Sequence, residues 1–427
     1  MSSKIAVIGT GYVGLTTGAC LAHLGHRVIC ADIDVEKITR LRNGNIPIVE
    51  LGLSELVQDG IASGKLYFVV GSAEAVKNCE IAFLCVPTPQ GEDGSADLSY
   101  IQQAASDISN ALPFEAIVVN KSTVPVGSTK VVERALGRPD VKVVSNPEFL
   151  REGSAVQDFL KPDRVVVGSD DQAAAIKVAS LYDGLSTRVI ITDPASAETI
   201  KYAANAFLAT KLSFINAIAA ICEGVGADIN DVVVGMGSDK RIGESFLRPG
   251  PGWGGSCFPK DSRALIKIAQ DANYNFDLLK GVITVNDEQF NRVVDKIVQS
   301  VGGSVSNKTI AVWGLTFKAG TDDLRDSPSI QIVQRLIDRG AKIQGYDPTV
   351  SAQREGIPAT VKVYASPIDA TIGADALAVL TEWEDFKWVS PLEVAAAMNG
   401  REVIDARNLL NRNDWERAGY TYQGIGH

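Results

Sequence analysis

One cysteine of this chain has neighbours that suit a nucleophile. Cys257 lies in a segment rich in glycine and proline, Pro249–Asp261, which cannot form the interior of a helix or a strand. Lys260 and Asp261 follow within four residues, and an ammonium group beside a thiol favours the reactive thiolate. The alternative is a structural turn with a buried, inert cysteine, and this segment alone does not decide between the two.

The remaining thiols and imidazoles do not indicate a metal or redox centre. The other cysteines belong to apolar runs, where a thiol behaves as a small hydrophobic group: Cys20, Cys30, Cys79, Cys85 and Cys222. Six cysteines without regular spacing do not form a disulfide framework. The only histidines are His23, His26 and His427, so neither a zinc site nor histidine-centred catalysis is expected.

The composition is that of a globular protein of more than one domain. A length of 427 residues is too great for a single core. The net charge of −10 argues against a nucleic-acid binder. The most apolar helical stretch, Tyr202–Cys222, contains Asn205, Lys211 and Asn216, which favours a buried helix over a membrane span. No signal peptide is apparent, so we expect a cytoplasmic protein with no membrane partner.

A dinucleotide fingerprint opens the chain. An apolar strand, Lys4–Ile8, leads into Gly9, Gly11 and Gly14 and then into a helical pattern. A second strand then ends at Asp32, which is placed to accept hydrogen bonds from ribose hydroxyls. An acid there repels a 2′-phosphate, and no arginine follows it, so NAD is favoured over NADP. The alternative is a purely structural glycine turn.

A long helix over Asp193–Gly224 carries polar residues on one face. Lys201, Asn205 and Asn216 fall within a stripe of roughly 60° at 100° per residue. Buried lysine and asparagine side chains need partners, so we expect this face to line a site. Scattered polar residues at the surface ends of the helix are the alternative.

The first pattern returns in the last third of the chain. Thr309–Gly314 resembles Lys4–Gly9, and Lys342–Asp347 resembles Arg27–Asp32, but Lys318 stands in the loop where the first copy has glycines. Alternating strands and helices predict an α/β fold with two Rossmann-like, doubly wound parallel-sheet domains joined by the long helix. We expect a NAD-binding Rossmann domain over 1–195, a central helical region with the cysteine loop over 196–300, and a second Rossmann-like domain over 301–427.

Taken together, these motifs resemble the UDP-glucose/GDP-mannose dehydrogenase family essentially from end to end. The matching segments are Gly9–Gly14, Cys85–Pro89, Ser122–Gly127, Asn146–Leu150, Lys201–Asn205, Gly254–Asp261 and Gly314–Lys318. The resemblance implies a four-electron, NAD-dependent oxidation of a sugar's primary alcohol to a carboxylate. UDP-glucose is the expected substrate, and GDP-mannose or a UDP-N-acetylhexosamine is the alternative.

This chemistry needs a thiol, because a free aldehyde does not readily donate a second hydride whereas a thiohemiacetal does. The resemblance implies that Cys257 is this nucleophile, with Lys201 and Asn205 stabilising oxyanions. It further implies that Asp261 and Thr123 hold a catalytic water and that Glu148 is the acid/base of thioester hydrolysis.

The resemblance also implies a homodimer formed through the dimerisation region 196–300, a UDP-sugar-binding domain over 301–427, and two sets of binding residues. Beside the glycines, cofactor contacts are expected at Val13, Asp32, Lys37, Thr88, Thr123, Glu152, Lys260 and Arg325. Substrate contacts are expected at Glu148, Phe149, Leu150, Arg151, Glu152, Lys201, Asn205, Arg241, Phe246, Leu247, Arg248, Pro249, Gly250, Gly254, Lys318 and Arg407. Among these, Arg241 matches an arginine that is donated across a dimer interface, and Lys37, Arg325 and Arg407 are solvated surface charges in the alternative interpretation.

Two other functions remain open on sequence grounds. A two-electron hydroxyacid or polyol-phosphate dehydrogenase would use a lysine base and release one NADH without needing the thiol. A non-catalytic nucleotide-sugar sensor is expected to have lost Cys257, Lys201 or Asp261, and this chain has all three.

Overall fold

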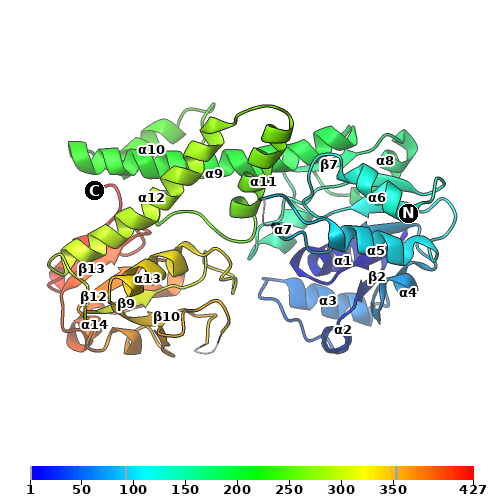
Figure 1. The fold of residues 1–427 in the computed structure, drawn as a ribbon. Coiled ribbons are helices and arrows are strands. Elements are labelled where there is room, and N and C mark those ends of the chain that lie inside the picture. Colours follow the sequence, from blue (N-terminus) through cyan, green and yellow to red (C-terminus); the bar gives the residue numbers. More distant parts are fainter. Residues whose placement is uncertain (1, 92–93, 352–353) are drawn as a thin grey trace. The chain divides into compact units, whose positions relative to one another are not determined.

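The computed structural model describes residues 2–91, 94–351 and 354–427, which form two compact units. The first unit contains the chain up to Ala204 together with Arg263–Asn273, and the second contains Asn205–Ser262 and Tyr274–His427. Each unit is built around its own sheet (Figure 1). The predicted division into three regions remains a prediction, because here the central helices are shared between the two units.

The first unit holds an eight-stranded sheet in the order β3-β2-β1-β4-β5-β6-β7-β8. Its strands are β1 (Lys4–Ile8), β2 (Arg27–Asp32), β3 (Leu66–Val70), β4 (Ile81–Leu84), β5 (Ile117–Asn120), β6 (Lys142–Ser145), β7 (Arg164–Gly168) and β8 (Arg188–Thr192). The first six run parallel in the Rossmann order, which confirms the predicted fold class. At the far edge β7 pairs antiparallel with β6, and β8 runs parallel to β7.

Helices cover both faces of this sheet. They are α1 (Tyr12–His23), α2 (Val35–Arg42), α3 (Leu53–Ala62), α4 (Ser72–Val76), α5 (Ser99–Ser109), α6 (Ser128–Leu136), α7 (Ala155–Leu160), α8 (Gln172–Ala179) and the 3-10 turn η1 (Ser180–Tyr182). Strand side chains alternate between two cores: Ile5 and Val7 belong to one, and Ala6 and Ile8 belong to the other. A strand buried on both faces has a continuous apolar sequence, as Ile5–Ile8 does.

The second unit repeats this architecture with six strands. Its strand order is β11-β10-β9-β12-β13-β14, and all the pairings are parallel. The strands are β9 (Thr309–Trp313), β10 (Lys342–Tyr346), β11 (Lys362–Val363), β12 (Ala376–Val379), β13 (Glu402–Asp405) and β14 (Thr421–Gln423). The associated helices are α13 (Pro328–Asp338), η2 (Asp369–Thr371), η3 (Glu384–Trp388), α14 (Pro391–Ala397) and α15 (Arg412–Arg417). The internal repeat predicted from the sequence is therefore a repeat of the whole Rossmann strand order.

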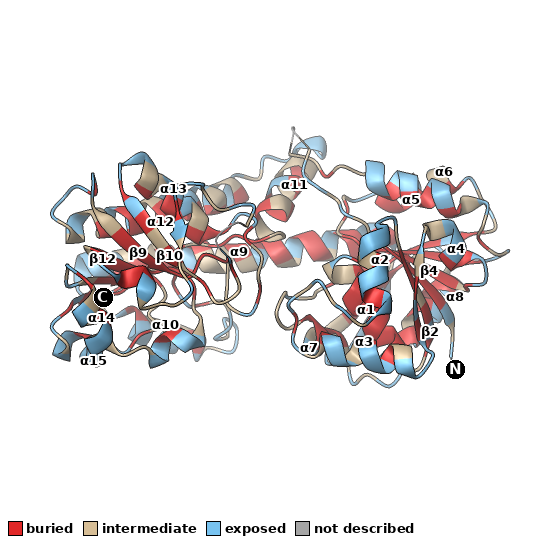
Figure 2. Cartoon of the chain, turned by 90° about the horizontal axis from the view of Figure 1, so that it is seen from below, coloured by how far each residue is buried: buried red, intermediate tan, exposed pale blue. Residues whose placement is uncertain are grey.

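In the sequence, the residues between β8 and β9 form helices and the loop that carries Cys257. The helices are α9 (Pro194–Val225), α10 (Ile229–Gly237), α11 (Phe258–Asp271) and α12 (Asp277–Ser300). By length and composition alone α9 is the one helix of the described residues that meets the criteria for a membrane span, and 44% of its most apolar window is buried. Buried polar residues, among them Glu198, Lys201 and Asn216, lie along it. Figure 2 shows the strands buried and the helices exposing their outer sides.

Candidate functional site

The glycines of the first unit make a tight turn with open space at its centre. Gly9 has a φ of +96°, and a Cβ there would lie 2.6 Å from the Cys85 carbonyl oxygen. A Cβ on Gly14 would lie 1.9 Å from the Gly9 carbonyl oxygen. At Gly11, just before α1, a Cβ would meet no atom within 4 Å. The outer glycines are thus required by packing, whereas Gly11 leaves room for a pyrophosphate at the helix N-terminus, as the fingerprint predicts.

Asp32 is held ready as an acceptor at the end of β2. Its Oδ2 accepts hydrogen bonds from the Thr10 backbone N–H at 2.9 Å and the Thr10 hydroxyl at 2.6 Å. Lys37 Nζ lies 3.0 Å from the same oxygen. Partial burial opposes ionisation, but these hydrogen bonds outweigh it and lower the pKa of Asp32 to about 2. The carboxylate and its neighbours fit the adenosine ribose of NAD, and Lys37 acts here as the partner of Asp32.

The loops that follow β4 and β5 are joined by hydrogen bonds. Thr88 donates its hydroxyl to the Thr123 carbonyl at 2.9 Å, and Ser122 donates to the Val86 carbonyl at 2.7 Å. Two of the predicted cofactor residues, Thr88 and Thr123, are therefore adjacent. Val13 packs against the apolar core beneath the glycine turn.

Glu148 and Lys201 form a buried ion pair within the first unit. Lys201 Nζ, from α9, lies 2.9 Å from Glu148 Oε1, and both side chains are about 5% exposed or less. The backbone N–H of Leu150 donates to Glu148 Oε2 at 2.6 Å. The Phe149 ring lies beneath the Lys201 ammonium, with Nζ 5.5 Å from its centroid. The sequence predicted the two charges separately, and the structure brings them into direct contact.

A buried lysine that the motifs did not single out lies beside this pair. Lys121, directly after β5, donates to Asn146 Oδ1 at 3.1 Å and to the Tyr182 hydroxyl at 3.3 Å. Burial is the main reason that the pKa of Lys121 falls to about 8, although Cys85 and Glu148 act in the opposite direction. Asn146 also donates to the Val166 carbonyl at 2.7 Å. This cluster fixes the start of the loop that carries Glu148.

Tyr12 links the glycine turn to the same loop. Its hydroxyl donates to Glu50 Oε2, and the Gly153 N–H lies 2.8 Å from the Tyr12 oxygen and 2.7 Å from Glu50 Oε2. Burial and the Glu50 hydrogen bond raise the pKa of the tyrosine. Glu50 was not predicted, because its partners Tyr12 and Gly153 are remote in sequence and its apolar neighbours Val49 and Leu51 are themselves exposed.

In the second unit, Cys257 directly precedes α11. The Asp261 N–H donates to the Cys257 carbonyl at 2.9 Å, which makes this cysteine the first residue of the helical hydrogen-bond pattern. Its side chain is partly exposed, and the Ser256 hydroxyl lies 3.6 Å from Sγ. An anion is stabilised at a helix N-terminus, so this position suits a thiolate. The expectation that the whole segment is non-helical was wrong for Phe258–Asp261, because α11 begins at Phe258, directly after the cysteine.

Side-chain hydrogen bonds to the backbone of Gly250 and Trp253 hold the loop before Cys257 in place. Asn286 accepts from the Trp253 N–H at 2.8 Å and donates to its carbonyl at 2.9 Å. Asn216 Oδ1 accepts from the Gly250 N–H at 2.9 Å, and Gln289 donates to the Gly250 carbonyl at 2.8 Å. Side chains from α9 and α12 therefore satisfy the buried backbone of the loop, which fixes where it presents the thiol.

The glycines of this loop are required by contacts with the protein itself. A Cβ on Gly252 would lie 2.4 Å from the Phe290 ring, and one on Gly255 would lie 2.7 Å from the Phe317 ring. A Cβ on Gly254 would lie 1.9 Å from the Asp326 carbonyl oxygen. The close neighbours that require these glycines are therefore the protein's own aromatic rings and backbone.

Asp261 is buried between two donors. Asn205 Nδ2 donates to Asp261 Oδ2 at 2.6 Å, and Lys260 Nζ lies 2.9 Å from Oδ1. Asp261 is 1% exposed. The carboxylate thus lies one helical turn after the thiol, held in place by Asn205 from α9. The predicted trio Cys257, Lys260 and Asp261 is one continuous local arrangement.

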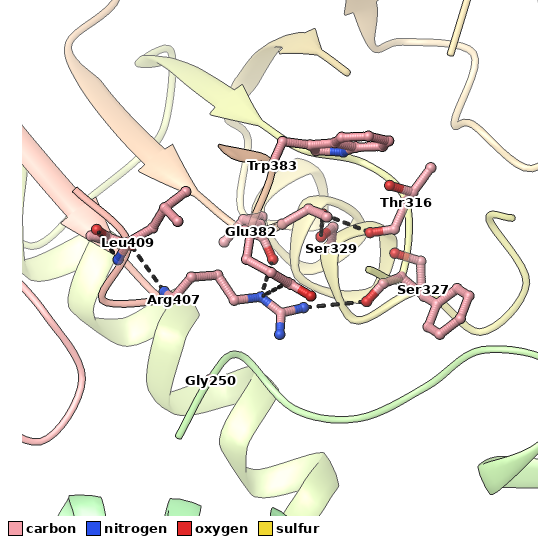
Figure 3. A network of polar contacts seen from close by, with 12 residues as sticks. Gly250, Thr316, Ser327, Ser329, Glu382, Trp383, Arg407 and Leu409 are labelled. Carbon is pink, nitrogen blue, oxygen red and sulfur yellow. Dashed lines mark hydrogen bonds and ion pairs between the residues drawn. The ribbon is translucent and has the colours of Figure 1, made fainter. Parts of the chain in front are cut away.

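Three of the predicted substrate residues of the second unit have defined contacts within the protein: Arg407, Lys318 and Phe246. Arg407, after β13, donates to the carbonyls of Leu380 at 2.8 Å and Phe317 at 3.2 Å (Figure 3). Lys318 follows Phe317 in the loop after β9, and its Nζ lies 5.7 Å from the Phe317 ring. Phe246 has a φ of +62° and packs near Phe258, with 6.4 Å between ring centroids.

The remaining predicted cations point into solvent or pair locally. Arg241 is 89% exposed and pairs with Asp239 at 2.6 Å, and Arg248 is also exposed. Arg151 pairs with Asp158 at 2.6 Å, as Arg325 does with Asp323 at the same distance. The roles predicted for these four arginines remain predictions.

Fold and local geometry define an NAD-dependent dehydrogenase with a second, Rossmann-like nucleotide-binding unit. Three family models match the chain: the NAD binding domain over residues 3–186, the central domain over 195–288 and the UDP binding domain over 311–412. The chain belongs to the UDP-glucose/GDP-mannose dehydrogenase family.

Individual relatives agree with this membership. The chain is 45% identical to UDP-glucose 6-dehydrogenase TuaD of Bacillus subtilis, over 99% of this chain and 93% of that protein. A solved UDP-glucose dehydrogenase from Pyrobaculum islandicum is 34% identical with a TM-score of 0.92, covering 100% of this chain and 98% of that one. A UDP-D-ManNAc dehydrogenase from Pyrococcus horikoshii is 27% identical with a TM-score of 0.87, covering 99% of each chain.

Proposed function

We propose that this chain oxidises UDP-glucose to UDP-glucuronate in two successive NAD-dependent steps, with Cys257 as the covalent nucleophile. The main support is the position of its thiol, partly exposed at the start of α11 and one turn before the buried Asp261. The overall reaction consumes one water and two NAD and yields the carboxylate, two NADH and three protons. NAD, when bound, accepts one hydride in each oxidation.

In the first step the C6 alcohol loses a hydride and its hydroxyl proton. Asp261 and Thr123 hold the water that removes this proton, and Lys201 and Asn205 stabilise the oxygen as charge develops on it. The buried Glu148–Lys201 pair supplies a preorganised ammonium, which costs little reorganisation during the reaction. The roles of Asn205 and Asp261 are coupled, because the amide of Asn205 donates to the Asp261 carboxylate.

In the second step the Cys257 thiolate adds to the aldehyde carbon and forms a thiohemiacetal. Loss of the second hydride gives a thioester, and the C–S bond then breaks as water adds. Glu148 acts as the base that takes a proton from this water, and the released thiolate restores the enzyme. A two-electron dehydrogenase would stop at the aldehyde and would leave Cys257 without a role.

UDP-glucose is the proposed sugar because relatives named for it are more similar to this chain than the relative named for UDP-D-ManNAc is. The identities are 45% and 34% against 27%. Purified protein is to be incubated with NAD and, in separate reactions, with UDP-glucose, GDP-mannose and UDP-N-acetylhexosamines. The expected result is NADH formation with UDP-glucose at two NADH per acid formed. No NADH with UDP-glucose, alongside turnover of another sugar, contradicts the choice of substrate.

We further propose a homodimer that forms along α9. Phe207, Phe214 and Ile221 repeat every seven residues on this helix and are 64%, 50% and 57% exposed. An exposed apolar stripe of this kind is typical of a contact surface rather than of a solvated face. Analytical ultracentrifugation is expected to show a dimer that Phe214→Glu converts to a monomer. A cytoplasmic location and the absence of membrane and nucleic-acid partners also remain predictions.

A further inference from the structure

A carboxylate lies beside Arg407, the arginine that we expect to contact the substrate. Glu382 follows β12, Arg407 follows β13, and Phe317 lies in the loop after β9, so the carboxyl ends of three neighbouring strands bring these residues together. Figure 3 shows Glu382 beside the Arg407 guanidinium. Glu382 Oε2 lies 3.0 Å from Arg407 Nε. An acid in this place is unexpected, because its charge repels an anionic ligand.

The guanidinium is fixed from several directions. Nε donates to the Leu380 carbonyl at 2.8 Å and Nη2 donates to the Phe317 carbonyl at 3.2 Å. The Nε hydrogen points to Leu380, so Glu382 Oε2, which is buried, contributes its charge and not an additional hydrogen bond within the described residues. The plane of the guanidinium is therefore set by two carbonyls and one carboxylate.

The third nitrogen faces the loop that precedes the cysteine. A Cβ added to Gly250 would lie 3.3 Å from Arg407 Nη1. The Gly250 N–H and carbonyl are already bonded to Asn216 and Gln289, so this backbone is fixed independently of the arginine. With Nε and Nη2 occupied, Nη1 is the edge of the guanidinium that is directed toward the predicted substrate segment Phe246–Gly250.

We propose that Glu382 is a positioning residue that orients Arg407 for the diphosphate of the nucleotide sugar, and so raises affinity despite its negative charge. This inference rests on the proposed function only in assigning Arg407 to the substrate. Simple charge repulsion and positioning predict opposite signs for the loss of the carboxylate charge. Repulsion predicts tighter binding of an anion by Glu382→Gln, whereas positioning predicts weaker binding, because Arg407 loses one of the three groups that hold its guanidinium.

Isothermal titration calorimetry with UDP measures this sign without depending on turnover. Glu382→Gln is expected to weaken UDP binding about fivefold to tenfold, within the range of coupling between two side chains in contact. Glu384→Gln is the matched control. It removes the same charge at a position two residues along the chain, from a carboxylate that pairs with Lys387 and not with Arg407. It is expected to leave UDP binding unchanged. Unchanged or tighter binding by Glu382→Gln overturns the proposal.

A double-mutant cycle shows whether Glu382 acts through Arg407. In an Arg407→Lys background, Glu382→Gln is expected to have little further effect on UDP affinity. An equal loss in both backgrounds overturns the positioning role, because Glu382 would then act independently of the arginine. Thermal unfolding of each variant separates weak binding from a folding defect. Wild-type protein that binds UDP but does not oxidise UDP-glucose contradicts the proposed function alone and leaves this test intact.

Discussion

Asp32 and Asp347 occupy equivalent positions at the ends of β2 and β10, but Asp347 is the more enclosed of the two, since the Asp32 side chain is 13% exposed. Asp347 Oδ2 accepts from the Leu315 N–H at 2.8 Å and from the Trp383 indole N–H at 3.1 Å. Its Oδ1 accepts from Thr349, and the residue is 2% exposed. Asp32 Oδ1 accepts only from the Asp34 N–H, at 3.2 Å, among the described residues. The second unit has kept the Rossmann fold while Trp383 covers the acid that would bind a ribose.

The two acids are therefore expected to respond differently to substitution. Asp32→Ala should weaken NAD binding at least about tenfold, because a charged acceptor for ribose hydroxyls is lost. Asp347→Ala should instead lower the free energy of unfolding by about 3 kcal/mol, since it leaves buried donors unpaired. Calorimetry with NAD and thermal unfolding measure the two effects, and wild-type protein should bind one NAD per chain. Two NAD per chain would show that the second site is open.

Replacement of Cys257 by serine should reduce acid formation by about 1000-fold or more, because an alkoxide does not replace the thiolate at neutral pH. Product is to be measured as UDP-glucuronate by chromatography, and NAD binding shows that the variant is folded. The matched control is Cys222→Ala, which removes a buried thiol from α9 and should retain activity. Full acid formation by the serine variant would refute the thioester scheme.

Lys121 should make stability depend on pH in a defined window. Its pKa is about 8 in the folded protein and ordinarily 10.5. Between these values the unfolded chain binds more protons, so the stability contribution of Lys121 rises with pH; below pH 8 the full cost of burying the ammonium is present. The shift corresponds to about 3 kcal/mol.

Lys121→Met removes this dependence. The free energy of unfolding of the variant, relative to that of wild type, should therefore fall by that amount between pH 8 and pH 10.5. Urea unfolding across this range is the measurement. Lys130→Met, at an exposed lysine on α6, should show no comparable change. A difference between Lys121→Met and wild type that stays constant with pH would contradict the assignment of a buried ammonium.

Glu198 connects α9 to the start of α6. This buried carboxylate accepts from the Gly127 N–H at 2.6 Å, the Thr129 N–H at 3.0 Å and the Thr129 hydroxyl at 2.8 Å. Glu198→Ala should cost about 2 kcal/mol of unfolding free energy, because the helix N-terminus loses its acceptor. The KM for NAD should also rise, since this turn ends the Ser122–Gly127 segment. Glu133→Ala is the control in thermal unfolding, because it removes a partly exposed carboxylate from α6 itself.

Local patterns predicted the cofactor end of the protein well. Gly9, Gly11, Gly14 and Asp32 form a motif whose partners lie within a few tens of residues, so spacing alone carries the geometry. The repeat at Thr309–Asp347 was equally visible, and the structure extends it to the full strand order. Strand β8 was missed, because it is a partly exposed edge strand without a continuous buried run.

Contacts between distant residues were not predictable in the same way. The pairing of Glu148 with Lys201 spans 53 residues, and the contact between Trp383 and Asp347 spans 36. The glycines at 252, 254 and 255 belong to a segment that the sequence marked only by its composition, and their partners Phe290, Asp326 and Phe317 lie far along the chain. A sequence can indicate that a backbone must approach something closely without indicating what it approaches.

The most direct test of the central claim is the mass of the intact protein after reaction of Glu148→Gln with UDP-glucose and NAD. With the base for hydrolysis removed, the thioester should accumulate, and peptide mapping should locate the added UDP-glucuronyl group on Cys257. Two NADH should be released per chain in a single burst. One NADH per chain, with unmodified protein and free aldehyde as the product, would contradict the covalent four-electron mechanism.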